Sequence, residues 1–302
     1  NDWKILMDKI KAGQAHLISE GDTMYLAACP KGRNSQDTRS QPFSPIPAMK
    51  RAYSLKSSYM TQILRRYIFG DEPCEKIIKD PALLHSNTFE ERFEEMLHPY
   101  IGKSRTELKA QFGITSIAKN INEILVAAML GLKGRLASTD EFQKASIVPK
   151  TITIGPGNTI KESMSFPAMD FCKMVNEKWE ESDLYNCLAP TKFLFIVFKR
   201  EDDGEYYFRC IKFWNIPIED LEEVHRVWQR TVDTLREGVH IWKDSRGRNC
   251  NNLPKASESR VAHVRPHGRD STDTTPLPTG GSMTKQCFWL NNSYVAKQIK
   301  EV

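Results

Sequence analysis

A short basic segment occurs twice in this chain, and the repeat constrains the fold more than any other feature. Residues 29–38, CPKGRNSQDT, match residues 265–274, RPHGRDSTDT, at the positions of Pro, Gly, Arg, Ser, Asp and Thr. The flanks repeat in the same order: Trp3 precedes Trp228 by 225 residues, and KRAYSLKSSYMTQI precedes KQCFWLNNSYVAKQI by 235. Three ordered blocks indicate an internal duplication, with a second copy about eleven residues longer than the first.

The two copies differ in what precedes them. The second copy has some 130 residues ahead of Trp228, from about Phe89, whereas only two residues lie ahead of Trp3. We therefore expect the chain to begin partway through a first domain, of which residues 1–70 are the C-terminal part. Residues 71–90, with two prolines among short polar and apolar pieces, are typical of a linker, and residues 91–302 are expected to form a complete second domain.

Composition limits the class of protein. Hydrophobic residues make up 40% of the 302 residues, which is enough for a core. The longest apolar block, FLFIVF at 193–198, has the length of a strand, so we expect no membrane span. Seven scattered cysteines without a CxxC pair are typical of reduced thiols in the cytoplasm. The net charge of +5 favours an anionic partner.

The expected elements mix helices and strands. The first copy should contain a helix over residues 2–12, a strand in MYLAAC, and a second helix from about Ser58. In the second copy, Ser104 and Glu107 form a capping-box helix start, and Gly113 is a helix stop. INEILVAAMLG predicts a further helix, which ends at Gly131.

The rest of the second copy predicts a sheet followed by a helix. SIVPKTITI and TKFLFIVFK have strand patterns, GPGNT predicts a turn, and a hairpin is expected across residues 203–204. A helix should begin after Pro217 and end at Gly238, and the polar tract 244–285 is expected to be a mobile loop. Together these elements predict an α/β or α+β fold, with a central mixed sheet flanked by helices.

These motifs resemble those of MutH, the mismatch-repair endonuclease that nicks at GATC. The blocks DWKILMDKIKAGQ, YLAACPKGRN and RAYSLKSSYM are similar to its C-terminal part, and PYIGKSRTELKAQFG, SIVPKTITI and HVRPHGRD extend the similarity through the second copy. Two MutH-like domains in one chain is the arrangement of MutH-related type II restriction endonucleases that cleave at GATC. The resemblance implies a restriction-endonuclease-like fold, double-stranded DNA as substrate, and Mg²⁺ as cofactor of the intact enzyme.

The resemblance also indicates where catalysis should take place. Such nucleases use a D…E-x-K cluster on two strands plus a Glu from a helix, and the carboxylates hold the Mg²⁺ that activates water. Lys150 matches the family Lys, whereas the Glu position is Val148, the Asp position is Glu141, and the helical Glu position is Ala127. One acid and one lysine give a divalent ion too few ligands. We therefore expect this chain to contain no metal site and no catalytic residue.

The resemblance assigns DNA contacts to both basic segments and to the strand after each. Arginine pairs with guanine, whereas lysine, serine and further arginines contact phosphates or base edges. The predicted DNA-binding residues are Lys31, Arg33, Ser54, Lys56, Arg265, His267, Arg269, Lys285 and Trp289. Cys29 stands where the family commonly has Arg, and His267 where it commonly has Lys, which puts base reading by either copy in question.

Simpler interpretations exist for several of these residues. A basic turn on a protein surface is usually just solvated, and Trp289 is equally compatible with the core of a strand. His263 and His267 lie four residues apart in an extended segment, a geometry that does not favour a zinc pair.

Three functions remain open at this stage. The leading hypothesis is a regulatory domain of a type II restriction endonuclease that binds GATC DNA and stimulates cleavage by the catalytic N-terminal half of the same protein. The alternatives are a Mg²⁺-dependent nuclease that uses other acids, such as Asp140 with Glu162, and a purely structural buttress for the catalytic half. The sequence does not decide whether two chains dimerise on DNA or whether methylated GATC is accepted.

Overall fold

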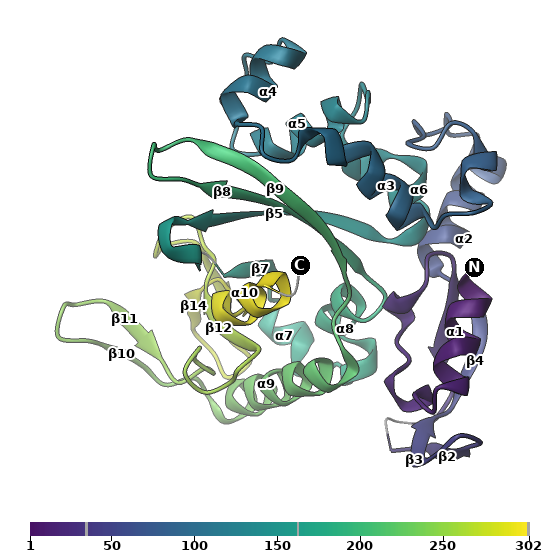
Figure 1. Ribbon diagram of the computed structural model, residues 1–302. Helices are drawn as coiled ribbons and strands as arrows, with labels where there is room; N and C mark the ends of the chain where they lie inside the picture. Colours follow the sequence, from purple (N-terminus) through teal and green to yellow (C-terminus); the bar gives the residue numbers. More distant parts are fainter. Residues whose placement is uncertain (34–35, 162, 301–302) are drawn as a thin grey trace. The chain divides into compact units, whose positions relative to one another are not determined.

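The computed structural model describes residues 1–33, 36–161 and 163–300, and its elements are labelled in Figure 1. The chain forms two compact units: residues 1–161 with 189–215, and residues 162–188 with 216–302. The repeat predicts a different division, at residues 71–90. Compactness and sequence repetition are separate criteria, so the predicted domain boundaries stay a prediction.

A four-stranded mixed sheet organises the first unit. Its order is β6 (Thr159–Ile160), β5 (Ile147–Gly155), β8 (Lys192–Arg200) and β9 (Tyr206–Trp214). β5 and β8 are parallel, and the other pairs are antiparallel. Every residue from 192 to 198 in β8 is buried, as expected of an apolar strand covered on both faces. The predicted strands and the predicted α/β class with a mixed sheet are confirmed.

Four helices cover this sheet along one face (Figure 1): α3 (Phe89–Leu97), α4 (Arg105–Phe112), α5 (Ile121–Met129) and α6 (Asp140–Ala145). Phe93 and Leu125 from the helices pack in one core with Leu194 and Phe198 from β8. α4 begins at the predicted capping box, because the Ser104 hydroxyl accepts the Glu107 N–H and the Glu107 carboxylate accepts the Ser104 N–H.

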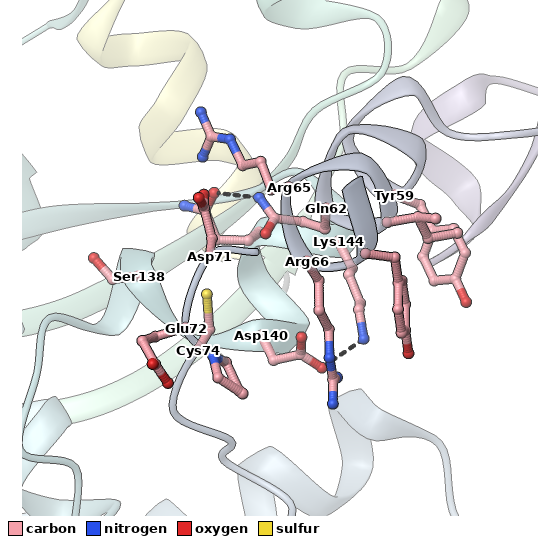
Figure 2. Close-up of a pocket in the computed structure, with 14 residues that line it drawn as sticks. Tyr59, Gln62, Arg65, Arg66, Asp71, Glu72, Cys74, Ser138, Asp140 and Lys144 are labelled. Atoms are coloured by element: carbon pink, nitrogen blue, oxygen red, sulfur yellow. Dashed lines mark hydrogen bonds and ion pairs between the residues drawn. The ribbon is translucent and has the colours of Figure 1, made fainter. Parts of the chain in front are cut away.

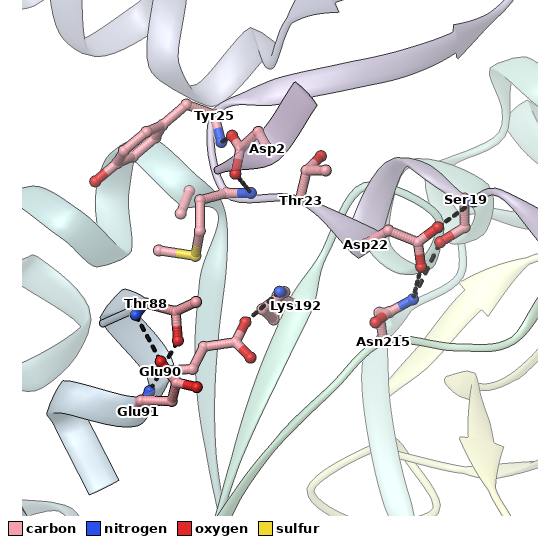
Figure 3. Close-up of polar contacts among 12 residues, drawn as sticks. Asp2, Ser19, Asp22, Thr23, Tyr25, Thr88, Glu90, Glu91, Lys192 and Asn215 are labelled. Atoms are coloured by element: carbon pink, nitrogen blue, oxygen red, sulfur yellow. Dashed lines mark hydrogen bonds and ion pairs between the residues drawn. The ribbon is translucent and has the colours of Figure 1, made fainter. Parts of the chain in front are cut away.

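Figure 3 shows an equivalent capping box that the sequence analysis did not single out. Thr88 and Glu91 exchange the same two hydrogen bonds at the start of α3. Next to them, the ammonium of Lys192 at the start of β8 forms an ion pair with Glu90. These contacts fix the first turn of α3 against the sheet.

The predicted linker is anchored to the core of the first unit. Ile77 and Ile78 are buried, and their backbone N–H groups donate to the carboxylate of Glu141 at distances of 2.9 to 3.1 Å. A freely moving connection would leave these groups in water, so part of residues 71–90 belongs to the packed structure.

The first copy of the repeat lies in the first unit. It comprises α1 (Asp2–Lys11), β1 (Leu26–Pro30), β2 (Thr38–Gln41), β3 (Ser44–Met49), β4 (Arg51–Leu55) and α2 (Ser57–Leu64), followed by a π-helical turn at Arg65–Phe69. The carboxylate of Asp2 accepts the N–H groups of Tyr25 and Leu26 at 2.7 and 2.9 Å, which ties α1 to β1 (Figure 3).

The second unit contains the segments of the second copy that repeat the first, from α9 onward. α9 (Ile218–Glu237) is the predicted helix, and a three-stranded antiparallel sheet has the order β12 (Ala262–Pro266), β15 (Gln286–Leu290) and β7 (Met164–Ala168). The remaining elements are two hairpins and three helices: β10 (Ile241–Lys243) with β11 (Asn249–Asn251), β13 (Thr274–Pro276) with β14 (Ser282–Thr284), α7 (Phe171–Met174), α8 (Asp183–Leu188) and α10 (Asn292–Lys300).

The tract 244–285 is therefore not the mobile loop that its polar composition suggested. It contributes strands to the β10–β11 and β13–β14 hairpins and contains all of β12. Val261, Ala262 and Val264 within it are buried. The few apolar residues of β12 stand among many Arg, Asn, Ser and Thr residues, so the composition of the tract did not indicate a strand. The β10–β11 hairpin has no counterpart in the shorter first copy.

Equivalent apolar side chains are covered in one copy and exposed in the other. Trp3 is 58% exposed, whereas its counterpart Trp228 is 3% exposed and packs 5.5 Å from the ring of Trp179. Leu55 is 47% exposed, whereas Leu290 is fully buried. The other pairs at the offset of 235 behave alike: Tyr53 with Phe288, Met60 with Val295, and Leu64 with Ile299. Among the described strands, β4 pairs with β1 alone, whereas β15 pairs with both β12 and β7.

Candidate nucleic-acid interface

Both basic segments begin on equivalent strands, each of which pairs antiparallel with a strand further along the chain. In the second copy, β12 pairs with β15 through Arg265↔Cys287 and Pro266↔Gln286. In the first copy, β1 pairs with β4 through Cys29↔Ala52 and Pro30↔Arg51, which is the same register. We call residues 29–38 the first turn and residues 265–274 the second turn. The repeat in sequence is thus a repeat in local structure.

The second turn presents a cluster of cationic and aromatic side chains. Arg265, His267 and Arg269 are all exposed, and the side chain of Arg269 retains 89% of its accessible surface. The guanidinium of Arg265 lies 4.9 Å from the centroid of the Trp289 ring, at cation–π distance. His267 meets the same ring edge-on at 5.5 Å. Trp289 is partly exposed and joins both side chains, so it is not simply a core residue.

The first turn offers cations without this aromatic ring. Lys31 and Arg33 are exposed, but the position of Trp289 is taken by the half-buried Ser54 and that of Arg265 by Cys29. Asn34 and Ser35 lie outside the described residues. The turn therefore retains charge suited to phosphates and lacks the arginine–tryptophan pair of the second turn.

Lys56 occupies a different environment from the one predicted for a DNA contact. It is 3% exposed, and its Nζ donates to the carbonyls of Ala145 at 3.2 Å and Pro190 at 3.3 Å. Burial, and then repulsion from Lys192, lowers the pKa of Lys56 to about 8. Its ammonium is enclosed by the first unit and does not face solvent, so we assign it no DNA contact.

Buried polar residues also follow β15. Asn291 is the counterpart of Lys56. Its Nδ2 donates to the Ser259 carbonyl at 2.7 Å, and its Oδ1 lies 2.6 Å from Nδ1 of His263. Burial lowers the pKa of His263. His263 is buried while His267 is exposed, an arrangement that does not favour a zinc ion shared by the pair.

The positions that the resemblance assigns to catalysis lie on three elements. Ala127 is buried on α5, and Val148 and Lys150 lie two residues apart on β5, so they face the same side of the sheet. Glu141 lies on α6, where both carboxylate oxygens accept N–H groups of Ile77 and Ile78. Its carboxylate thus has a structural role in anchoring the segment before α3.

The donor set does not fit a magnesium ion. Hard divalent cations need several oxygen ligands, and here alanine and valine occupy two positions while the one acid is engaged elsewhere. Within the described ranges, no three His, Cys, Asp or Glu side chains are grouped so as to hold a metal ion.

Comparison with curated proteins places the chain in a family. Over its whole length it is 40% identical to Type II restriction enzyme Sau3AI of Staphylococcus aureus, and it covers 69% of that protein. The chain belongs to the type II restriction enzymes. This result confirms the prediction of a type II restriction endonuclease and agrees with the mixed α/β architecture. A scan against models of protein families finds no match. No helix in the described ranges of this restriction enzyme is long and apolar enough to cross a membrane.

A pocket of about 370 Å³ in the first unit is lined by both acidic and basic side chains (Figure 2). Asp71, Glu72 and Asp140 line it, together with Arg65 and Arg66. Asp140 forms an ion pair with Lys144 at 2.7 Å. Glu162, the other acid considered for an alternative site, lies outside the described residues.

Two aspartates of the turns were not predicted as functional residues. Asp37 and Asp273 each accept a backbone N–H from the arginine of their turn. The signal was present in the sequence, because both belong to the residues that repeat. In the sequence alone, a repeated Asp looks the same as an Asp that only stabilises a turn by a local hydrogen bond.

Proposed function

We propose that this chain binds double-stranded DNA containing GATC through its second turn, as the regulatory part of a type II restriction endonuclease, and does not itself cleave. The observation that carries the proposal is the exposed group of Arg265, His267 and Arg269, held on a hairpin with Trp289 beneath Arg265. The GATC sequence is taken from the resemblance to MutH-related enzymes.

Each side chain of the second turn has chemistry suited to a duplex. Arg265 can donate two hydrogen bonds to O6 and N7 of guanine in the major groove, and His267 can bind a neighbouring base edge. Arg269 has the exposure and charge of a phosphate contact. The first turn, with Lys31 and Arg33 exposed, supports contact with backbone phosphates more than base reading.

The absence of cleavage follows from the donor set. Ala127 and Val148 cannot ligate a cation, and Glu141 is committed to backbone N–H groups. We expect Mg²⁺ to act in the catalytic N-terminal half of the intact enzyme, where DNA binding by the present chain stimulates cleavage. Such stimulation is allosteric if GATC binding here changes DNA affinity or assembly at the other site.

The exposed apolar residues of the first copy support a second domain of the same kind. Trp3, Tyr53 and Leu55 are exposed, whereas their counterparts are buried in the second unit, where β15 also pairs with β7. Exposed apolar residues that lie together usually mark an interface. We propose that residues 1–70 complete a MutH-like domain, whose other elements cover these side chains in the intact enzyme.

Incubation of the purified chain with a plasmid that contains GATC sites tests the proposal. With Mg²⁺ present, we expect the protein to bind the plasmid and to make no site-specific nick, even after long incubation. A site-specific cut would favour the nuclease alternative.

The exposed face of the first copy also favours a buttress for the catalytic half. If the chain were only a buttress, Arg265→Ala and Arg269→Ala in the intact enzyme would leave stimulation by additional GATC sites unchanged. We expect both substitutions to abolish most of that stimulation.

A further inference from the structure

One aspartate closes the second turn through three close contacts and one longer ion pair. Oδ2 of Asp273 accepts the backbone N–H of Arg269 at 3.1 Å, and Oδ1 forms an ion pair with Nζ of Lys285 at 2.7 Å. The backbone carbonyl of Asp273 accepts the N–H of Lys285 at 2.9 Å, and Oδ2 lies 3.9 Å from Nε of Arg269. Asp273 therefore joins the second turn to Lys285, the residue that precedes β15.

The first turn has the same three contacts. Oδ2 of Asp37 accepts the Arg33 N–H at 3.1 Å, Oδ1 pairs with Nζ of Lys50 at 2.5 Å, and the Asp37 carbonyl accepts the Lys50 N–H at 3.4 Å. For both aspartates the lysine ion pair, followed by the arginine N–H, lowers the carboxyl pKa. The contacts agree atom for atom although the exposed residues of the two turns differ.

The second turn is also wrapped closely around Asp273. A Cβ at Gly268 would lie 3.0 Å from the Asp273 carbonyl oxygen and 3.2 Å from its Cβ. Such contacts are closer than an ordinary side chain accepts, so glycine allows the backbone to fold against the aspartate. The backbone that carries His267 and Arg269 is thereby fixed from inside the turn.

A carboxylate is unfavourable for DNA affinity in simple electrostatic terms. It repels phosphates, and it engages a lysine that would otherwise attract them. Its contribution to binding must therefore be geometric: a turn fixed before binding loses less conformational freedom when it meets a specific sequence.

We propose that Asp37 and Asp273 are positioning residues that hold the turn arginines and lysines in the geometry that recognises specific DNA. This inference rests on the proposed DNA-binding function. On this proposal, the two aspartates raise the preference for a specific DNA sequence and lower the affinity for every duplex.

Asp270 provides a matched control within the second turn. Its carboxylate accepts the Thr272 N–H at 2.8 Å and the Thr272 hydroxyl at 2.6 Å, and the backbone N–H of Asp273 also lowers its pKa, but no described hydrogen bond joins it to Arg269 or Lys285. Asp270→Ala and Asp273→Ala remove the same charge, but only Asp273→Ala releases Arg269 and Lys285. A change caused by charge alone will appear in both variants.

The experiment measures the affinity of the full chain for a GATC duplex and for a scrambled duplex of the same composition, by fluorescence anisotropy. We expect Asp273→Ala to lower the ratio of the two affinities about 5- to 10-fold, from the loss of about one ordinary hydrogen bond. Asp37→Ala, in the turn suited to phosphates, should lower the ratio by a smaller factor. Affinity for the scrambled duplex should stay constant or rise. Asp270→Ala should raise both affinities and change their ratio less than about 2-fold.

An unchanged ratio overturns the assignment for that turn, and so does an equal fall in Asp270→Ala. If Asp273→Ala does not fold, Asp273→Asn replaces it in the test. An asparagine oxygen still accepts the Arg269 N–H, whereas the ion pair with Lys285 is lost. An affinity ratio for Asp273→Asn no lower than that for Asp270→Asn contradicts the proposal. A wild-type chain with no preference for GATC refutes the proposed function itself, which is a separate result.

Discussion

The guanidinium of Arg265 lies over the indole of Trp289, 4.9 Å from the ring centroid, in the one turn of the repeat whose following strand carries a tryptophan. The first copy has Cys29 and Ser54 at these two positions. A stacked guanidinium has fewer orientations than a free one, so the pair prepares Arg265 for one direction of hydrogen bonding.

Trp289→Ser, which introduces the residue of the first copy, should lower the preference for GATC over scrambled DNA. A cation–π contact contributes about 0.5–1 kcal/mol, so we expect a loss of about 2- to 5-fold in the affinity ratio. Trp289→Phe retains a ring and should lose less. Equal ratios in wild type and Trp289→Ser, measured by competition binding, would show that the ring does not orient Arg265.

Arg269→Ala should weaken binding to every duplex alike, because phosphates carry no sequence information. The slope of log affinity against log salt should become shallower by about 1. Arg226→Ala is the control: Arg226 is an exposed arginine on α9 that is ion-paired with Glu223. If both variants change the slope equally, Arg269 has no privileged contact with DNA.

Lys56 should make stability rise with pH in the alkaline range. Its folded pKa is about 8, below the ordinary value of 10.5, so between these pH values the unfolded chain binds more protons than the folded chain. The free energy of unfolding of wild type, relative to Lys56→Met, should therefore increase by about 2–3 kcal/mol from pH 8 to pH 10.5. Urea titrations at several pH values measure this, with the exposed Lys119→Met as control. A flat difference would contradict the buried ammonium.

Tyr294→Phe should destabilise the second unit. The Tyr294 hydroxyl donates to Oδ2 of Asp220 at 2.7 Å, and both residues are buried. Loss of a buried hydrogen bond to a carboxylate costs about 1–3 kcal/mol, which thermal unfolding detects readily. Tyr207→Phe removes a similar bond to Asp203 at an exposed hairpin and should have a much smaller effect. Comparable losses in the two variants would contradict the burial argument.

Local signals in the sequence predicted the elements well. Ser104 and Glu107 form the predicted capping box, Gly113 ends α4 in the left-handed region with φ of 64°, and the apolar run of β8 is the buried centre of the sheet. Each of these depends on neighbouring residues or on a continuous pattern, which a sequence displays directly.

Contacts between distant segments were the part that the sequence did not reveal. Lys56 is enclosed by carbonyls of Ala145 and Pro190, and Glu141 is bound to N–H groups of Ile77 and Ile78. In the sequence, this lysine and this glutamate look like ordinary surface residues. Their burial depends on tertiary packing, which also explains why a predicted DNA contact turned out to be internal.

One titration tests the central claim most directly, that this chain recognises specific DNA without cutting it. A labelled GATC duplex is bound to the chain in the presence of Mg²⁺ and displaced by unlabelled GATC or scrambled duplex, and the recovered strands are then sized on a denaturing gel. We predict displacement by GATC at a concentration at least about 10-fold lower than by the scrambled duplex, with all strands intact. Equal displacement by the two duplexes, or strands cleaved at GATC, would contradict the account.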